Sequence, residues 1–206
     1  MVTLGEGGMI TTSSKKLFEN MLSHRSLCCR TYDPKGKYLA IDEVVQPMGK
    51  RYWHLEFDGV GFNYRMTEIQ AAVGLIQLRK LNAFNSRRIE IAKQYSEGLR
   101  GIPGLRLPVL APDVKHVFHV YCLCVEPEFR LSKEDFMWEI YANKQIKAWS
   151  HYMPIHLTSV YRSFGHHEGD CPVAEAMFHK YVSIPIHPRL TEEAVQYVIR
   201  SIRELA

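Results

Sequence analysis

The most constraining feature of this sequence is the segment at residues 61–81, where a polar and aromatic stretch leads into a strongly periodic apolar one. Thr67 and Gln70 have the spacing of a capping box, in which two side chains satisfy free amides at a helix start. The apolar residues that follow recur at helical intervals on two neighbouring faces. We therefore expect a long helix that begins at Thr67 and is covered on two sides. The stripes are Ile69, Ala72, Val73 and Ile76 on one face, and Ala71, Leu75, Leu78 and Leu81 on the other.

Asn63 and Arg65 lie in extended backbone directly before this helix start. Free amides and the positive end of the helix dipole already favour an anion at such a position. The guanidinium of Arg65 and the side-chain amide of Asn63 add hydrogen-bond donors there, which predicts a phosphate site. The alternative is that Asn63 shapes the turn while Arg65 pairs with a surface carboxylate.

The N-terminal part of the chain begins with a glycine-rich turn at residues 5–8, followed by a short apolar and β-branched run at 9–12. The run predicts a strand. Ser13 or Ser14 then caps a predicted helix that ends near His24.

Residues 31–58 change in character, with prolines and glycines set among basic and aromatic residues. This composition predicts a long irregular loop. Loops of such length inside compact domains are often lids or binding loops. A solvated insertion without a role is the open alternative.

The C-terminal part alternates between extended and helical patterns, which predicts a small α/β sandwich. The apolar run at 116–125 is rich in β-branched and aromatic residues and predicts a buried strand. A second amphipathic helix precedes it, with one face made by Phe84, Arg88, Ile91, Tyr95 and Leu99. The later elements are a helix capped by Ser132 and Asp135, a strand around 146–151, a helix starting at Asp170 and Pro172, an extended piece at 183–186 and a final helix capped by Thr191.

The composition excludes several classes of protein. The 206 residues include 26 basic and 22 acidic ones without a run of like charges, so no nucleic-acid partner is expected. No apolar stretch approaches the ~20 residues of a membrane helix, and no leader is recognisable. The five cysteines form no disulfide framework. We therefore expect a cytoplasmic protein without a membrane partner.

A cluster of possible metal ligands lies between residues 151 and 171. Zinc ligands usually come in pairs separated by a few residues, whereas two of these histidines are adjacent and no paired cysteine element accompanies them. We therefore predict no metal site. The cluster comprises His151, His156, His166, His167 and Cys171.

Four segments carry a family resemblance: GEGGM at 5–9, GFNYRMTEIQAA at 61–72, YMPIHL at 152–157 and GDCPVAE at 169–175. Together, and in this order, they resemble the DegT/DnrJ/EryC1/StrS aminotransferases over essentially the whole chain. The resemblance implies pyridoxal-phosphate (PLP)-dependent transamination of a nucleotide-linked keto-sugar.

The resemblance also implies an α/β fold, the C-terminal part of a fold-type-I PLP aminotransferase. We expect one leftover strand of the large domain, long connecting helices and a small α/β sandwich domain. The implied boundaries are 1–65 for the remnant of the PLP-binding domain, 66–100 for the connecting helices and 101–206 for the small domain.

The family assigns roles to three residues of this sequence. Asn63 matches an asparagine that contacts the cofactor phosphate of the neighbouring subunit, and Arg65 lies close to the same shared site. Phe62 replaces a common tyrosine. His156 matches a histidine that faces the active-site cleft, so His156 and Arg65 are candidates for substrate binding. The alternative is that His156 is a structural histidine at a strand end, with its hydrogen bonds made within the protein.

The family's Schiff-base lysine precedes the GEGG turn by a few residues, which would put it just upstream of Met1. Lys15 and Lys16 belong to a predicted surface helix and are expected to be solvated. We therefore expect no catalytic residue in this chain, which would be inactive alone or a subunit of a split enzyme. The expected partners are another copy of the chain or a separate large-domain polypeptide. The complete enzyme would act on a nucleotide-sugar and an amino donor. The alternatives are a non-catalytic interaction module or a gene remnant, with exposed apolar surface.

Overall fold

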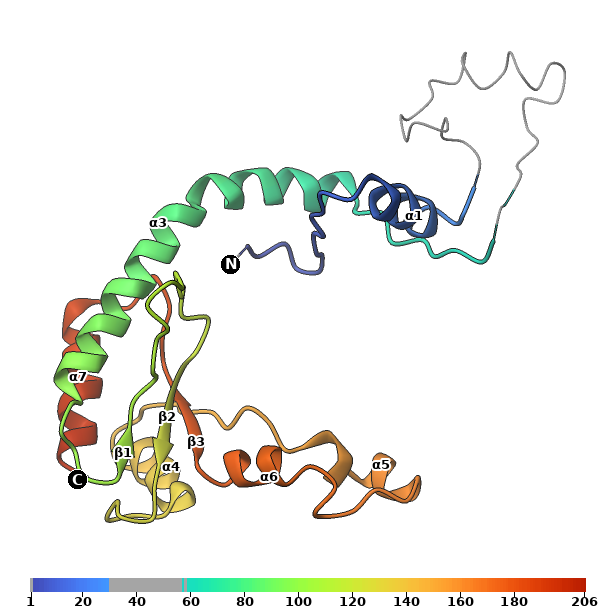
Figure 1. Ribbon diagram of the computed structural model, residues 1–206. Coiled ribbons are helices and arrows are strands. Elements are labelled where there is room, and N and C mark those ends of the chain that lie inside the picture. The colour runs from blue at the N-terminus through green and yellow to red at the C-terminus, as the bar shows by residue number, and fades with distance from the viewer. Residues whose placement is uncertain (1, 30–56, 58) are drawn as a thin grey trace, which may run out of the picture. The chain divides into compact units, whose positions relative to one another are not determined.

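The computed structural model describes residues 2–29, 57 and 59–206 (Figure 1). The loop predicted at 31–58 therefore lies outside the described residues, apart from Phe57. The chain divides into two compact units, Val2–Arg79 and Lys80–Ala206, and the division falls within a helix.

The unit Val2–Arg79 begins with helix α1, Lys15–Arg25, which matches the predicted one. Its N-cap is Ser14, whose hydroxyl accepts a hydrogen bond from the amide of Leu17 at 3.4 Å. Polar caps of this kind satisfy one of the free amides of the first turn. This helix buries no residue in the structure, so it is a surface helix.

The predicted strand at residues 9–12 is not formed. Met9 and Ile10 keep 77% and 76% of their surface exposed. A strand exists only when its amides and carbonyls pair with a neighbour. Among residues 2–29, 57 and 59–206 no segment pairs with this run, so its β-branched composition alone does not produce a strand.

Helix α3, Glu68–Gly98, is one continuous helix of 31 residues, where the sequence patterns predict two. The capping box is formed as predicted: the amide of Gln70 donates to Thr67 Oγ1 at 3.3 Å, and the amide of Thr67 donates to Gln70 Oε1 at 3.1 Å. The stretch between the two predicted helices contains no proline that would break the helix. The two periodic patterns therefore merge.

The two halves of α3 differ in burial. Ile91 and Tyr95, on the predicted face of its C-terminal half, have no exposed surface, whereas Ile69 and Leu75 near its start are 79% and 62% exposed. Within the part of the chain that the structure describes, the expected two-sided cover of the N-terminal half is absent.

The sheet of the unit Lys80–Ala206 has three antiparallel strands in the order β1-β2-β3. They are β1 (Leu105–Arg106), β2 (Tyr121–Val125) and β3 (Tyr181–Ile184). Leu105 pairs with Val125, and Tyr121 with Ile184.

Strand β2 is shorter than the predicted strand at 116–125. Phe118 has a φ of 49°, in the left-handed region, and its amide donates to His116 Nδ1 at 3.1 Å. This local turn prevents regular pairing before Tyr121. The predicted strand around 146–151 is reduced to a single bridge between Trp149 and Ser183.

Four α-helices and one short 3₁₀ helix complete this unit. The predicted caps are confirmed: Ser132 Oγ accepts from the amide of Asp135 at 3.1 Å, and Thr191 Oγ1 accepts from the amide of Ala194 at 3.2 Å. Pro172 occupies the first turn of its helix, as predicted. The helices are α4 (Lys133–Ala142), η1 (Ile155–Leu157), α5 (Ser159–Ser163), α6 (Pro172–Phe178) and α7 (Glu192–Arg203).

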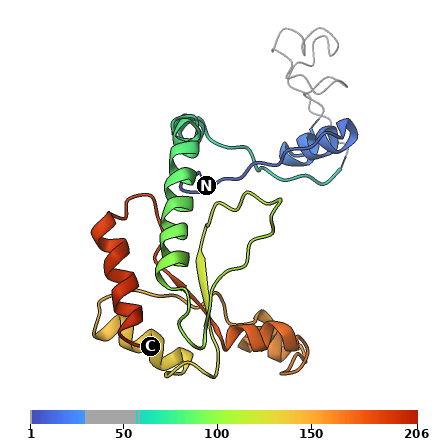
Figure 2. The same cartoon turned by 60° about the vertical axis from the view of Figure 1, so that its left-hand side comes forward.

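Helix α7 runs alongside the C-terminal part of α3 (Figures 1 and 2). The helices approach closely at Gly98, where an added Cβ would lie 2.8 Å from side-chain atoms of Ile199. Arg203 Nε donates to the carbonyl of Gly98 at 2.6 Å. The core behind them joins α3, the sheet, α4 and α7, and its largest fully buried side chains include Tyr95, Tyr121, Phe136, Ile91, Leu99, Leu123, Ile140 and Ile202.

No helix in the described ranges is both long and apolar enough to cross a membrane. The five cysteines, all in those ranges, are free.

A charged network at the end of β2 makes the stability of this unit depend on pH. Hydrogen bonds from Lys180, Cys124 and Arg106 lower the pKa of Glu126 from its ordinary 4.5 to about 2. A carboxyl with a depressed folded pKa contributes stability above its unfolded pKa and loses it as pH falls through the folded value.

We therefore expect Glu126→Gln to lower the melting temperature at neutral pH, and the difference from the wild type to shrink between pH 4.5 and 2. Melting curves by circular dichroism at several pH values test this. A difference that stays constant down to pH 2 would contradict the network's role. Because the network is on the surface, added salt should reduce the effect.

Candidate functional site

The predicted phosphate-site residues lie on an extended segment that pairs with the chain leaving α1. The amide of Phe62 donates to the carbonyl of His24 at 2.7 Å, and the amide of Tyr64 donates to that of Arg25 at 3.0 Å. Asn63 forms an antiparallel bridge with Ser26. This short ladder holds the backbone on both sides of Asn63.

Gly61 allows this ladder to form. A Cβ at this position would lie 2.4 Å from the amide nitrogen of Cys28, closer than any side chain can approach. Beyond it, successive side chains alternate between the two faces of the extended segment. The rings of Phe62 and Tyr64 stack on one face, with centroids 4.9 Å apart.

Asn63 and Arg65 are brought together by this alternation. Arg65 Nε donates to Asn63 Oδ1 at 3.1 Å, and both residues are exposed. Among residues 2–29, 57 and 59–206 no carboxylate pairs with Arg65. Within these residues, the other guanidinium N–H groups and the Asn63 side-chain NH₂ remain as donors.

These groups fit a phosphate. The pair lies a few residues before the first turn of α3, whose free amides and dipole favour an anion. Guanidinium donors make strong, geometrically specific bonds to phosphate oxygens.

The glycine-rich turn at residues 5–8 contacts the start of α3, which joins two segments far apart in sequence. Gln70 Nε2 donates to the carbonyl of Glu6 at 2.9 Å. Leu4 packs over Gly74, where an added Cβ would lie 2.9 Å from Leu4 Cδ2. The capping-box spacing predicts the local role of Gln70, but not this second contact.

Lys15 and Lys16 lie on α1, exposed to solvent as the sequence suggests. Lys15 forms an ion pair with Glu19 at 3.7 Å, and its side chain is 79% exposed. An exposed pair of this kind contributes little energy.

His156, the other candidate site residue, belongs to the unit Lys80–Ala206 and lies in η1. It is buried, and its Nε2 is 2.7 Å from Glu175 Oε1. The Glu175 carboxylate also accepts hydrogen bonds from the amides of Gly169 and Cys171. The bond from Gly169 is the largest cause of a lowered Glu175 pKa, and His156 and Cys171 add to it. Sequence reasoning did not single out Glu175.

The neighbouring loop holds two more histidines on one carboxylate. His166 Nδ1 and His167 Nδ1 lie 3.0 and 3.1 Å from oxygens of Asp170. The hydrogen bond from His166, with that from the His167 amide, lowers the pKa of Asp170. In residues 2–29, 57 and 59–206, no group of three or more histidine, cysteine, aspartate and glutamate side chains is placed to hold a metal ion.

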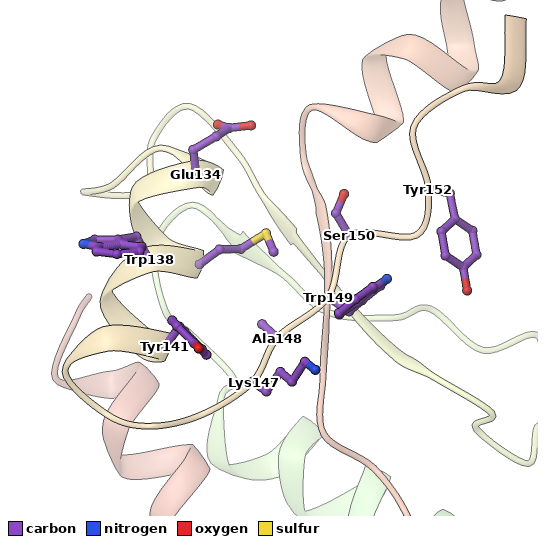
Figure 3. Close-up of a pocket in the computed structure, with 9 residues that line it drawn as sticks. Glu134, Trp138, Tyr141, Lys147, Ala148, Trp149, Ser150 and Tyr152 are labelled. Atoms are coloured by element: carbon purple, nitrogen blue, oxygen red, sulfur yellow. The ribbon is translucent and has the colours of Figure 1, made fainter. Parts of the chain in front are cut away.

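An open aromatic groove of about 700 Å³ lies between α4 and the segment at 147–152 (Figure 3). Trp138 and Tyr141 on α4 are 65% and 58% exposed, and Lys147 Nζ lies 5.1 Å from the ring centroid of Trp149. Exposed aromatic surfaces of this kind mark interaction sites. The spacing of Trp138 and Tyr141 on one helix face is the signal that sequence reasoning missed.

Lys133, the first residue of α4, connects the two sides of this groove. Its side chain is buried, and its ammonium donates to Ser150 Oγ at 2.8 Å and to the carbonyl of Phe178, and lies 4.2 Å from the Phe178 ring centroid. Burial lowers the pKa of this lysine. The residue therefore ties α4 to the segment at 147–152 and to the end of α6.

Comparison with known proteins gives consistent matches along the whole chain. Residues 1–203 match the model of the DegT/DnrJ/EryC1/StrS aminotransferase family. An uncharacterised protein of Methanocaldococcus jannaschii is 32% identical over 211 residues, which is 99% of this chain and 50% of that protein. The dTDP-3-amino-3,4,6-trideoxy-alpha-D-glucose transaminase of Streptomyces venezuelae is 32% identical over 203 residues, 98% of this chain and 46% of the relative.

The fold is likewise that of a solved structure. The aminotransferase TlmJ of Streptoalloteichus hindustanus superposes with a TM-score of 0.76 at 26% identity, over 98% of this chain and 48% of that one. The chain thus spans about half the length of the relatives it matches.

Proposed function

Because this chain belongs to the DegT/DnrJ/EryC1/StrS aminotransferase family, we propose that it supplies the C-terminal part of a PLP-dependent aminotransferase for a nucleotide-linked keto-sugar. The similarity to a transaminase named for a dTDP-linked amino sugar supports the substrate class. The observation that carries the proposal is the exposed Asn63–Arg65 pair, held by a backbone ladder before the start of α3.

The cofactor, when bound, would supply an electron sink and would carry the amino group between the two halves of the reaction. Asn63 and Arg65 would hold its phosphate with their free N–H groups. The ladder to α1 holds the backbone around Asn63, and the Arg65–Asn63 hydrogen bond links the two side chains, so less conformational freedom is lost when the phosphate binds. Arg65 also serves as a cationic contact for the substrate, and His156 contributes a polar one.

The complete enzyme has further components in this proposal: a nucleotide-sugar, an amino donor and a second polypeptide, which is another copy of this chain or a large-domain partner. Support for the polypeptide comes from the apolar residues left exposed along the first half of α3, since exposed patches of this kind mark protein interfaces. We assign the enzyme to the cytoplasm, where its free cysteines remain reduced.

A titration of the purified chain with PLP, followed by absorbance, tests the phosphate site. Arg65→Ala should weaken binding roughly tenfold or more, because a hydrogen bond to a charged group contributes about 1.5–3 kcal/mol. Asn63→Ala should weaken it less. The matched control is Arg79→Ala, which removes the same charge from an exposed position further along α3.

Equal titration curves for Arg65→Ala and Arg79→Ala would contradict the proposed site. Borohydride reduction followed by mass mapping then asks whether a lysine of this chain holds the cofactor. Modification of one lysine would show that this chain holds the cofactor covalently. If no lysine is modified specifically, the cofactor-binding lysine is supplied by another segment. Pyridoxal without its phosphate is the ligand control, and Arg65→Ala should not change its binding.

A further inference from the structure

We propose that Glu175 is a positioning residue, which fixes the ring orientation and tautomer of His156 so that Nδ1 is the ring nitrogen presented to the nucleotide-sugar. The substrate contact rests on the proposed function. The positioning itself rests on the geometry of the unit Lys80–Ala206.

The Glu175 carboxylate is held from several directions. Both its oxygens accept from the amide of Gly169 at 3.0 Å, and Oε1 also accepts from the amide of Cys171 at 3.1 Å. Glu175 lies in the first turn of α6, where the helix dipole favours a negative charge. The carboxylate is therefore in place before it meets any imidazole.

An ionised carboxylate only accepts hydrogen bonds. The 2.7 Å contact between Glu175 Oε1 and His156 Nε2 consequently requires a proton on Nε2. In a neutral imidazole the other nitrogen, Nδ1, then carries the lone pair. The side chains of both residues are close to 90% buried, at 10% and 11% exposure, so the contact is shielded from competing water.

Nδ1 of His156 is the free end of this arrangement. Within the described ranges it has no hydrogen-bond partner. No buried side-chain nitrogen or oxygen lacks a partner in those ranges, so Nδ1 must reach solvent. The carboxylate thus occupies one ring nitrogen and leaves the other open to a ligand. Carboxylates orient metal-binding histidines in the same way, through the ring nitrogen that does not bind the metal.

The same loop contains an internal control. His166 and His167 contact Asp170 through Nδ1, the opposite nitrogen, and their side chains are 49% and 74% exposed. Asp170 in this loop and Glu175 in α6 should therefore select opposite tautomers of the histidines that they contact. Buried His156 should be firmly in the Nε2–H form, whereas the exposed pair should be mixed by exchange with water.

The test is a two-bond ¹H–¹⁵N correlation spectrum of the histidine-labelled chain, at a pH where the imidazoles are neutral. His156→Gln assigns the signal by removing it. In the wild type we expect the Nε2–H tautomer of His156 in roughly tenfold excess or more. A predominant Nδ1–H form would overturn the proposal, and this arm needs no variant that could unfold.

Glu175→Ala provides the second arm. It removes the oxygen that lies 2.7 Å from His156 Nε2, so the preference for Nε2–H should fall to a mixture. Asp170→Ala is the matched control, which should shift the signals of His166 and His167 and leave His156 unchanged. An unaltered His156 signal in a folded Glu175→Ala variant would contradict the positioning role.

A dTDP-linked hexose added to the wild-type chain separates the two levels of the proposal. We expect the His156 Nδ1 signal to shift more than that of Nε2. If the tautomer result holds and the sugar shifts neither nitrogen, the substrate role of His156 in the proposed function fails, while the positioning by Glu175 stands. If the tautomer result fails, the further inference fails whatever the ligand does.

Discussion

Replacing Phe136 with alanine should lower the free energy of unfolding of the unit Lys80–Ala206 by about 3–5 kcal/mol, the range for deleting a buried phenyl ring. Phe136 has no exposed surface and packs edge-to-face on Phe129, with ring centroids 5.7 Å apart. It projects from α4 into a core shared with α3, the sheet and α7. The loss combines the transfer free energy of the ring with the cavity left behind.

Tyr141→Ala is the matched control, because it removes a ring of similar size from the same helix. Tyr141 is 58% exposed at the aromatic groove, and its removal should change stability by no more than about 0.5 kcal/mol. Urea unfolding followed by circular dichroism measures both. Similar losses for the two variants would mean that α4 does not pack in the way described.

Gly104→Ala should lower the free energy of unfolding at least as much as Phe136→Ala, by about 4 kcal/mol or more. Gly104 has a φ of 69°, and an added Cβ would lie 2.0 Å from the amide nitrogen of Phe129. Its carbonyl accepts from the amide of Glu126 at 2.8 Å. Because the obstructing atoms are backbone, relief of the overlap would separate the end of β2 from the turn before β1.

Gly101→Ala isolates the steric contribution. Gly101 also has a positive φ, 78°, but an added Cβ there would meet no atom within 4 Å. Gly101→Ala should therefore lower the free energy of unfolding only by the strain of a left-handed backbone at alanine, about 1–2 kcal/mol. Equal denaturation midpoints for the two glycine variants would exclude the close approach of Gly104 to Phe129.

The helix starts could be predicted from the sequence because their chemistry is local. Ser14, Ser132, Thr67 and Thr191 each accept from an amide three residues further on. All the atoms of such a cap lie within one helical turn, so residue types and spacing suffice.

The strands were predicted less well, because each depends on a partner distant in sequence. The run at 9–12 has the composition of a strand but no partner in the described ranges, and the segment near 146–151 pairs only at Trp149. Strand β2 begins only after a turn at Phe118, whose amide donates a hydrogen bond to His116. The apolar composition of residues 116–125 does not predict this turn.

In the candidate site, too, local features could be predicted and contacts between distant segments could not. Asn63, Arg65 and His156 could be selected from short segments that resemble a family. The contact of Gln70 with Glu6 joins residues 64 positions apart, and the Glu175–His156 pair joins residues 19 apart. The aromatic groove requires α4 and the segment at 147–152 to lie together.

Residue identity at short spacing is enough to predict the helix caps, the buried face of the C-terminal half of α3 and the family to which the chain belongs. The continuity of α3, the choice of runs that become strands and the contact between Glu175 and Nε2 of His156 follow only from the folded chain. Backbone pairing and buried hydrogen bonds need groups from two distant segments at a distance of about 3 Å, and spacing along the sequence does not specify that approach.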